Sequence, residues 1–330
     1  MSSLKHIAIV ATGGTIAAQN TTPTALGDYI VNQPIDTLLA AIPALADIAR
    51  ISAHEVCHID SRDMHFALQH QLITRVQQLL ANPDIDGIVI THGTDTLEET
   101  ALLLHWCIKS TKPVIMTGAM RPSSAISADG PLNLYHAVLV ACNADAHGLG
   151  TLVLSNDQLY SARFVQKMHT SAPSAFAAPT TGATGLVSNG KVYINTVPRR
   201  PFGRNNALTL PKEVSAWPQV DIIYDHVGAN PKLYTASVLS GAKAIVIAAL
   251  GNGSLSPAAR AGAHYATSRN TLCIRASRIP DGAVTPSEQD ATYQTLPAHQ
   301  FHATAARTLT ALALANKASK VEIGYYLQHY

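Results

Sequence analysis

The fold class of this chain is decided by Ala-Thr-Gly-Gly-Thr-Ile-Ala at 11–17 and Thr-His-Gly-Thr-Asp-Thr-Leu-Glu-Glu-Thr at 91–100. Each stretch follows directly on a short apolar run that is typical of a buried parallel strand. In open α/β sheets, ligands bind beyond the carboxyl ends of such strands, near a topological switch point. We therefore expect Thr15 and the pair Thr94–Asp95 to lie at a functional site.

Strand-like and helix-like segments alternate through the first 150 residues or so, which predicts a mostly parallel sheet covered by helices on both faces. Strands are expected near 6–11, 51–57, 86–91, 113–118 and 151–155, and helices near 35–48, 65–81, 96–109 and 130–144. Asn189-Gly190, inside the alternating segment 186–194, predicts a hairpin with a tight primed turn.

A chain of 330 residues is long enough for two domains. We expect an α/β protein with a larger N-terminal domain at 1–197, a proline-rich linker at 198–218 and a smaller C-terminal α/β domain at 219–330. In the C-terminal part, strands are expected near 221–225, 244–249 and 271–275, and helices near 256–268, 300–316 and 319–328.

Composition and charge argue against several classes of protein. Charged residues make up 13%, about half the usual share of roughly 25%, which favours an oligomer, although a polar uncharged exterior also explains it. The net charge of +2 without a basic stripe argues against nucleic-acid binding. We see no apolar stretch long enough for a membrane span and no signal peptide. We expect a cytoplasmic protein, or a periplasmic one if an export signal has been removed.

The histidines and cysteines do not have the spacing of a metal site. The four cysteines at 57, 107, 142 and 273 are far apart and form no zinc pattern. His54 and His58 fall on an expected strand, where residues four apart are widely separated. We expect no metal.

A hydroxyl next to a carboxylate, with no serine–histidine arrangement nearby, suggests threonine as a nucleophile. Gly13-Gly14 before Thr15 allows the backbone to approach a ligand closely, although the same residues suit an ordinary turn. Thr94-Asp95-Thr96 also fits a helix N-cap with acidic residues in the first turn.

The two threonine stretches resemble the signature motifs of the bacterial-type L-asparaginase family, which includes the glutaminase-asparaginases. Further similar segments follow in order from about residue 6 to the C-terminus: Ser61–Met64, Lys112–Ala137, Lys167, Gly251–Gly253 and Ser277–Gly282. The resemblance implies a two-domain amidohydrolase that converts L-asparagine to L-aspartate and ammonia without a cofactor. It also implies a homotetramer, a dimer of dimers, with active sites shared between subunits.

The resemblance also implies roles for individual residues. Thr15 is the expected nucleophile, and Tyr29, which follows a polar loop that would close over the substrate, is expected to help activate it. Thr94, Asp95 and Lys167 form an expected second triad, in which a buried lysine accepts a proton through Thr94. The expected substrate-binding residues, the last two of which would reach a neighbouring subunit's site, are Gly14, Ser61, Arg62, Gly93, Ala119, Asn252 and Glu288.

Three alternatives remain open from the sequence. They are a dual glutaminase-asparaginase, a subunit that supplies ammonia for amidating a mischarged tRNA, and a non-catalytic amino-acid binding protein. The last is opposed by intact Thr15, Thr94, Asp95 and Lys167, since binding alone needs no nucleophile. Arg62 departs from the family pattern, which has glutamine there; its guanidinium either turns to solvent or crowds the pocket edge.

Overall fold

The computed structural model describes residues 4–20, 22, 24 and 30–330. The chain divides into two compact units, Met1–Asn205 and Asn206–Tyr330. The division falls inside the segment 198–218, for which the sequence predicts a linker. The domain boundaries at 197 and 219 themselves stay a prediction.

The first unit is built on a mostly parallel sheet with the strand order β12-β11-β8-β7-β6-β5-β1-β4. Its parallel strands are β1 (Lys5–Gly13), β4 (Ala49–Ile59), β5 (Gly87–Thr91), β6 (Val114–Thr117) and β7 (Thr151–Ser155). The antiparallel strands are β8 (Gln158–Ser161), β11 (Gly185–Ser188) and β12 (Lys191–Ile194). The predicted α/β class is confirmed.

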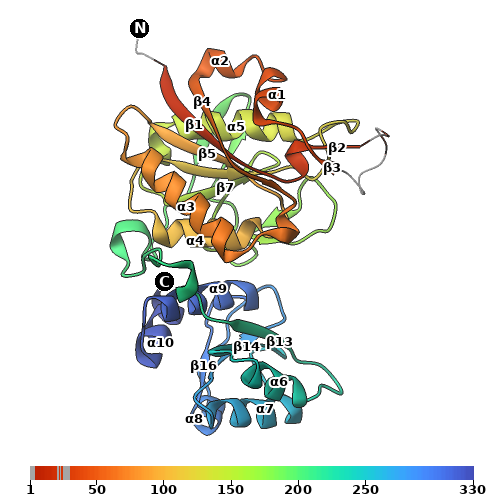
Figure 1. The fold of residues 1–330 in the computed structure, drawn as a ribbon, viewed down its shortest axis with the longest axis vertical. Helices are drawn as coiled ribbons and strands as arrows, with labels where there is room; N and C mark the ends of the chain where they lie inside the picture. The colour runs from red at the N-terminus through yellow and green to blue at the C-terminus, as the bar shows by residue number, and fades with distance from the viewer. Residues whose placement is uncertain (1–3, 21, 23, 25–29) are drawn as a thin grey trace. The chain divides into compact units, whose positions relative to one another are not determined.

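Helices cover both faces of this sheet (Figure 1). On one face, α1 (Ile35–Ala40), α2 (Leu45–Ile48) and α5 (Gly130–Cys142) bury their apolar side chains against β1, β5, β6 and β7 in a single core. On the other face lie α3 (Phe66–Ala81) and α4 (Leu97–Cys107). The central strands β5, β6 and β7 are buried on both faces, and apart from threonine and serine at their ends they are apolar.

The single helix expected at 35–48 is wrong. Two short helices form instead, separated by residues 41–44. Pro43 has no backbone N–H to donate and disfavours helical geometry at the residue before it. The first helix therefore ends before the proline, at Ala40. The hairpin expected around Asn189-Gly190 is confirmed, since both residues have the positive φ angles, 48° and 71°, of a primed turn.

The remaining elements of the first unit are short. They are the 3-10 helices η1 (Thr15–Ala17), η2 (Ser61–Asp63), η3 (Ala144–Ala146) and η4 (Gly203–Asn205), and the paired strands β2 (Ala18–Gln19) with β3 (Ile30–Val31) and β9 (Gln166–Lys167) with β10 (Phe176–Ala177). Several of them carry predicted site residues.

The second unit has a parallel sheet with the order β13-β14-β15-β16. Its strands are β13 (Val220–Tyr224), β14 (Ala244–Ala249), β15 (Leu272–Ser277) and β16 (Thr295–Pro297). After η5 (Val214–Ala216), its helices are α6 (Lys232–Leu239), α7 (Pro257–Thr267), α8 (Glu288–Tyr293), α9 (Ala303–Ala315) and α10 (Lys320–His329). The sequence pattern did not indicate α6, α8 or β16. In the described part of the chain, no helix is long and apolar enough to cross a membrane.

Candidate active site

Four of the predicted site residues of the first unit follow the carboxyl ends of four neighbouring strands. Thr15 follows β1, Ser61 follows β4, Thr94 follows β5 and Ala119 follows β6, and these strands are adjacent in the order β6-β5-β1-β4. The chain places β4 on one side of β1 and β5 on the other, which makes the β1–β5 boundary a topological switch point.

Two glycines bring the backbones of these strand ends into contact. Gly14 has a positive φ of 80°, and a Cβ atom there would lie 2.3 Å from the Cα of Gly93. A Cβ atom on Gly93 would in turn lie 2.6 Å from Ser61 Oγ. Gly14 N also donates to the carbonyl oxygen of Ile59 at 2.8 Å. Only glycine permits this approach, so the two threonine stretches and the end of β4 form one surface.

Lys167 joins the second threonine stretch through its side chain. Its Nζ donates to Thr94 Oγ1 at 2.8 Å and to Asp95 Oδ1 at 2.5 Å. The lysine side chain is 17% exposed, whereas the Asp95 side chain is 55% exposed. The three residues that the sequence groups into a triad are therefore in direct contact, with the carboxylate on the solvent side.

Ser61 and Thr15 are both buried at this edge of the sheet. Ser61 Oγ accepts from Asp95 N at 3.1 Å, and Ser61 O accepts from Thr96 Oγ1 at 2.9 Å, so η2 is tied to the start of α4. Thr15 begins η1 immediately after Gly14. Ala119 is buried as well.

The Arg62 side chain extends into solvent and pairs with Asp60. Its Nη2 pairs with Asp60 Oδ2 at 3.2 Å, and its side chain is 72% exposed. Asp60 also caps η2 by accepting from Arg62 N at 3.1 Å. Tyr29 lies outside the described residues.

Asn252 and Glu288 belong to the second unit. The Asn252 side chain is engaged with Thr285: its Nδ2 donates to Thr285 Oγ1 at 2.9 Å, and its Oδ1 accepts from Thr285 N at 2.8 Å. Glu288 is exposed at the first position of α8.

A buried arginine that the sequence did not point to ties together the two segments carrying these residues. Arg275 on β15 is fully buried and donates to the carbonyl oxygens of Asn252, Gly253 and Thr285 at 2.8–3.2 Å. Its Nε and Nη2 also donate to Asp290 at 3.0 and 2.7 Å. Burial acts to raise the pKa of Asp290, but hydrogen bonds from Arg275, Thr295 and Ser287 outweigh it and lower that pKa.

Family comparisons agree with this architecture over both units. The family model for the asparaginase N-terminal domain matches residues 6–200, and the model for the glutaminase/asparaginase C-terminal domain matches residues 219–327. This chain belongs to the asparaginase family. Individual relatives are similar to this chain over nearly its whole length.

Three similar proteins illustrate the family. L-asparaginase 2 of Bacillus subtilis (strain 168) is 40% identical over 99% of this chain and 87% of its own length. A glutaminase-asparaginase of Pseudomonas fluorescens biotype A is 36% identical over 98% of this chain and 90% of its own length. The crystal structure of a protein described as a probable cytoplasmic L-asparaginase from Campylobacter jejuni superposes with a TM-score of 0.95, at 36% identity, over 99% of this chain and 100% of that one.

In this asparaginase-family chain, Glu98 is another residue that the sequence did not point to, and it contacts Lys167. It lies in the first turn of α4, and its Oε2 accepts from the backbone N of Lys167 at 2.7 Å. In the sequence it could not be told from an ordinary first-turn glutamate, because its partner lies 69 residues away. His92, in the second threonine stretch, is completely buried beside Gly93. Burial lowers its pKa to about 4, although a hydrogen bond to Gly93 O acts to raise it.

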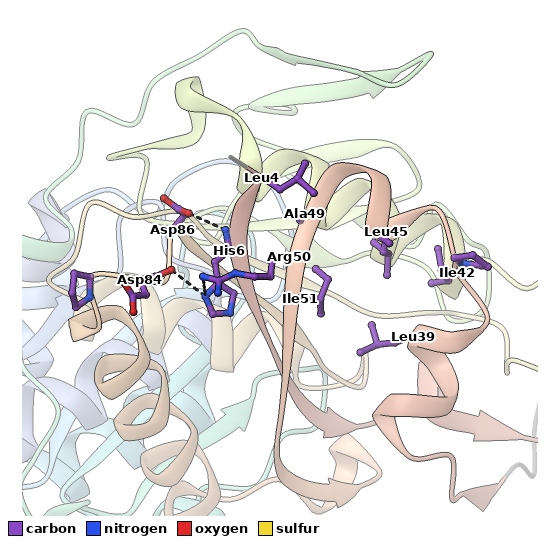
Figure 2. A pocket seen from close by; sticks show the side chains of 13 residues that line it. Leu4, His6, Leu39, Ile42, Leu45, Ala49, Arg50, Ile51, Asp84 and Asp86 are labelled. Atoms are coloured by element: carbon purple, nitrogen blue, oxygen red, sulfur yellow. Dashed lines mark hydrogen bonds between the residues drawn. The ribbon is translucent and has the colours of Figure 1, made fainter. Parts of the chain in front are cut away.

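Other features of this asparaginase-family chain lie apart from the cluster. Among the described residues, no group of three or more His, Cys, Asp or Glu side chains could hold a metal ion. A pocket of about 930 Å³ lies near the starts of β1 and β4. Apolar side chains such as Leu39 and Ile42 line it together with His6 and Arg50, as Figure 2 shows. None of the predicted site residues that the structure describes lines it.

Proposed function

We propose that this asparaginase-family chain hydrolyses L-asparagine to L-aspartate and ammonia, with Thr15 as nucleophile. The observation that carries the proposal is the contact of Lys167 Nζ with Thr94 Oγ1 and Asp95 Oδ1, at the strand ends where Gly14 and Gly93 touch. A hydroxyl, an amine and a carboxylate in hydrogen-bond reach are the groups that amide hydrolysis needs to move protons.

The proposed reaction has two steps. The Thr15 hydroxyl oxygen attacks the side-chain amide carbon of the substrate, the carbon–nitrogen bond breaks, and the departing nitrogen takes up the hydroxyl proton to leave as ammonia. Water then attacks the resulting ester, which releases L-aspartate and returns a proton to Thr15. We assign activation of Thr15 to Tyr29, and activation of the water to Thr94 with the neutral amine form of Lys167 as its proton acceptor.

The substrate's charged ends need partners as well. We assign the α-ammonium group to Asp95, and the α-carboxylate to Ser61 and backbone amides near Gly14 and Gly93. We assign Ala119 a position beside the scissile amide of the substrate. This assignment is supported by the half-exposed Asp95 carboxylate, which remains open to solvent although it pairs with Lys167.

Ammonia release from L-asparagine, measured for the unaltered protein over micromolar to millimolar concentrations, tests the proposal. We expect saturable release of ammonia and L-aspartate in equal amounts. Binding of L-asparagine without any turnover would contradict the proposal and favour a non-catalytic binding protein.

Dual glutaminase-asparaginase activity is the second candidate, because one relative at 36% identity carries that name. We expect a preference for asparagine that Arg62→Gln reduces, since a bulky cation near Ser61 disfavours a side chain one methylene longer. Because Arg62 is 72% exposed and paired with Asp60, the shift in the kcat/KM ratio of the two amides should be about tenfold or less. An unchanged ratio would leave Arg62 as a surface residue.

We further propose a homotetramer in which Asn252 and Glu288 complete the site of another subunit. The low charged fraction of 13% supports an assembly that buries much of each chain's surface.

We also propose a cytoplasmic location, because the similar Campylobacter jejuni protein is described as a probable cytoplasmic L-asparaginase. Fractionation of cells that express the natural gene tests it, and recovery in the periplasmic fraction would contradict it.

A further inference from the structure

Lys167 lies on a segment with little secondary structure of its own. β9 consists of Gln166 and Lys167 alone, and it pairs with the equally short β10, where Phe176 lies opposite Lys167. The next backbone bonds, from Met168 N and His169 N, both go to Ala175 O. A two-residue ladder fixes a strand weakly, so the position of Lys167 depends on other contacts.

Glu98 supplies such a contact to the backbone of Lys167. The partly buried carboxyl oxygen Oε2 accepts from Lys167 N at 2.7 Å. Glu98 comes three residues after Asp95 and four after Thr94, at the start of α4, so the same turn of chain binds both the backbone and the side chain of Lys167. Lys167 is thereby held at two points by one rigid element.

We propose that Glu98 is a positioning residue of the active site, which holds the Lys167 backbone at the distance where its Nζ meets Thr94 and Asp95. The proposal rests on the proposed amide hydrolysis for its effect on turnover. It goes beyond the assigned triad, because Glu98 touches neither the substrate nor the reacting atoms and acts through Lys167 alone.

The electrostatics of Glu98 agree with a role as hydrogen-bond acceptor rather than as a fixed charge. Burial raises the pKa of Glu98 to about 7, and neighbouring Glu99 acts in the same direction, while the hydrogen bond from Lys167 N and the lysine charge act against it. A carboxyl oxygen accepts from the Lys167 N–H whether the group is ionised or neutral. Glutamine, which keeps an acceptor oxygen of similar reach, should therefore replace Glu98 in function.

The test compares Glu98→Ala, Glu98→Gln and the matched control Glu99→Gln, which removes a carboxylate from the same first turn of α4. We expect Glu98→Ala to lower kcat at least about tenfold with little change in KM, since misplacing a catalytic group acts on the chemical step. Glu98→Gln and Glu99→Gln should keep most of the activity. In a Lys167→Met background, Glu98→Ala should cost nothing further, because both changes remove the same group from the site.

Backbone amide exchange at Lys167 provides a readout that does not need turnover. We expect faster exchange in Glu98→Ala, and exchange at the unaltered rate in Glu98→Gln and Glu99→Gln. If the unaltered protein releases no ammonia, the proposed function fails, and the exchange rates alone decide whether Glu98 holds Lys167. Unaltered exchange in Glu98→Ala, wild-type kcat in that variant, or equal damage from glutamine and alanine would each overturn the proposal.

Discussion

Single residues of this site meet over long separations in the sequence. Lys167 contacts Thr94 across 73 residues and Asp95 across 72, and Glu98 contacts the Lys167 backbone across 69. Thr94, Asp95 and Glu98 all lie between the end of β5 and the first turn of α4. Lys167 is thus the residue on which the proposed second triad converges, and its removal should affect the triad as a unit.

We predict that Thr94→Val and Lys167→Met each lower kcat by at least about a hundredfold, because general acid–base assistance is worth roughly 10²–10⁴-fold. The double variant should lose no more than either single one, since residues that act as a unit are not additive. The exposed residues Thr196 and Lys191 offer matched controls, Thr196→Val and Lys191→Met, which should keep full activity. Fully additive losses in the double variant would show that the two residues act separately.

How far the sequence predicts these residues depends on what kind of partner each has. Thr15, Thr94 and Asp95 could be found because they follow directly on buried apolar strands, and Lys167 because of a family resemblance. Glu98 and Arg275 could not, because Glu98 accepts from a backbone N–H and Arg275 donates to three backbone carbonyl oxygens besides the Asp290 carboxylate. A contact to a backbone atom leaves no residue type in the sequence from which to recognise it.

At the scale of elements, segments with a strong apolar or alternating pattern followed the sequence expectation, and weakly patterned ones did not. Strands with continuous apolar runs and helices such as α3 and α9 appear close to their expected positions. The six-residue helix α8 has no apolar periodicity and depends instead on the Ser287–Asp290 capping box and on Arg275. The contacts from Arg275 to Asp290 are tertiary hydrogen bonds, which apolar periodicity does not reveal.

We predict that Asp290→Ala destabilises the second unit by about 3–5 kcal/mol, because it leaves the fully buried Arg275 without its carboxylate partner. Urea unfolding followed by circular dichroism measures the loss. The control Glu213→Ala removes an exposed carboxylate from the same unit and should change little. A loss equal to that of the control would show that Arg275 is satisfied by its carbonyl contacts alone.

The same ion pair has a pH dependence of defined sign. The folded state lowers the pKa of Asp290, so its contribution to stability is complete above the unfolded value of about 3.9 and is lost as the pH falls through the folded value. The difference in unfolding free energy between the unaltered protein and Asp290→Ala should therefore be constant near neutral pH and shrink in acid. A difference that grows in acid would contradict the assigned direction.

At the scale of the whole molecule, the residues proposed for one site are distributed over both units of the chain. Thr15, Thr94 and Lys167 belong to the first unit, and Asn252 and Glu288 to the second. The proposed homotetramer joins them across subunits. Sequence predicts this arrangement only through family resemblance, because no local pattern records which surface of one chain meets another.

We predict that mixing inactive Thr15→Ala subunits with inactive Glu288→Ala subunits restores part of the activity, because some mixed sites carry neither defect. Light scattering should give four times the mass of the single chain for both proteins and for the mixture. Exchange of differently tagged subunits must be verified first. If subunit exchange is verified but turnover does not recover, then either the site is not shared between subunits or Glu288 has no role in it.

In the proposed mechanism, Thr15 carries the acyl group during hydrolysis of L-asparagine. Acid quenching of the enzyme during turnover, followed by mass spectrometry of the peptide that contains Thr15, tests this directly. We predict an aspartyl ester on Thr15 in the unaltered protein and none in Thr15→Ala, whose kcat should fall by more than about a hundredfold. Turnover of L-asparagine by Thr15→Ala at the unaltered rate would contradict the claim.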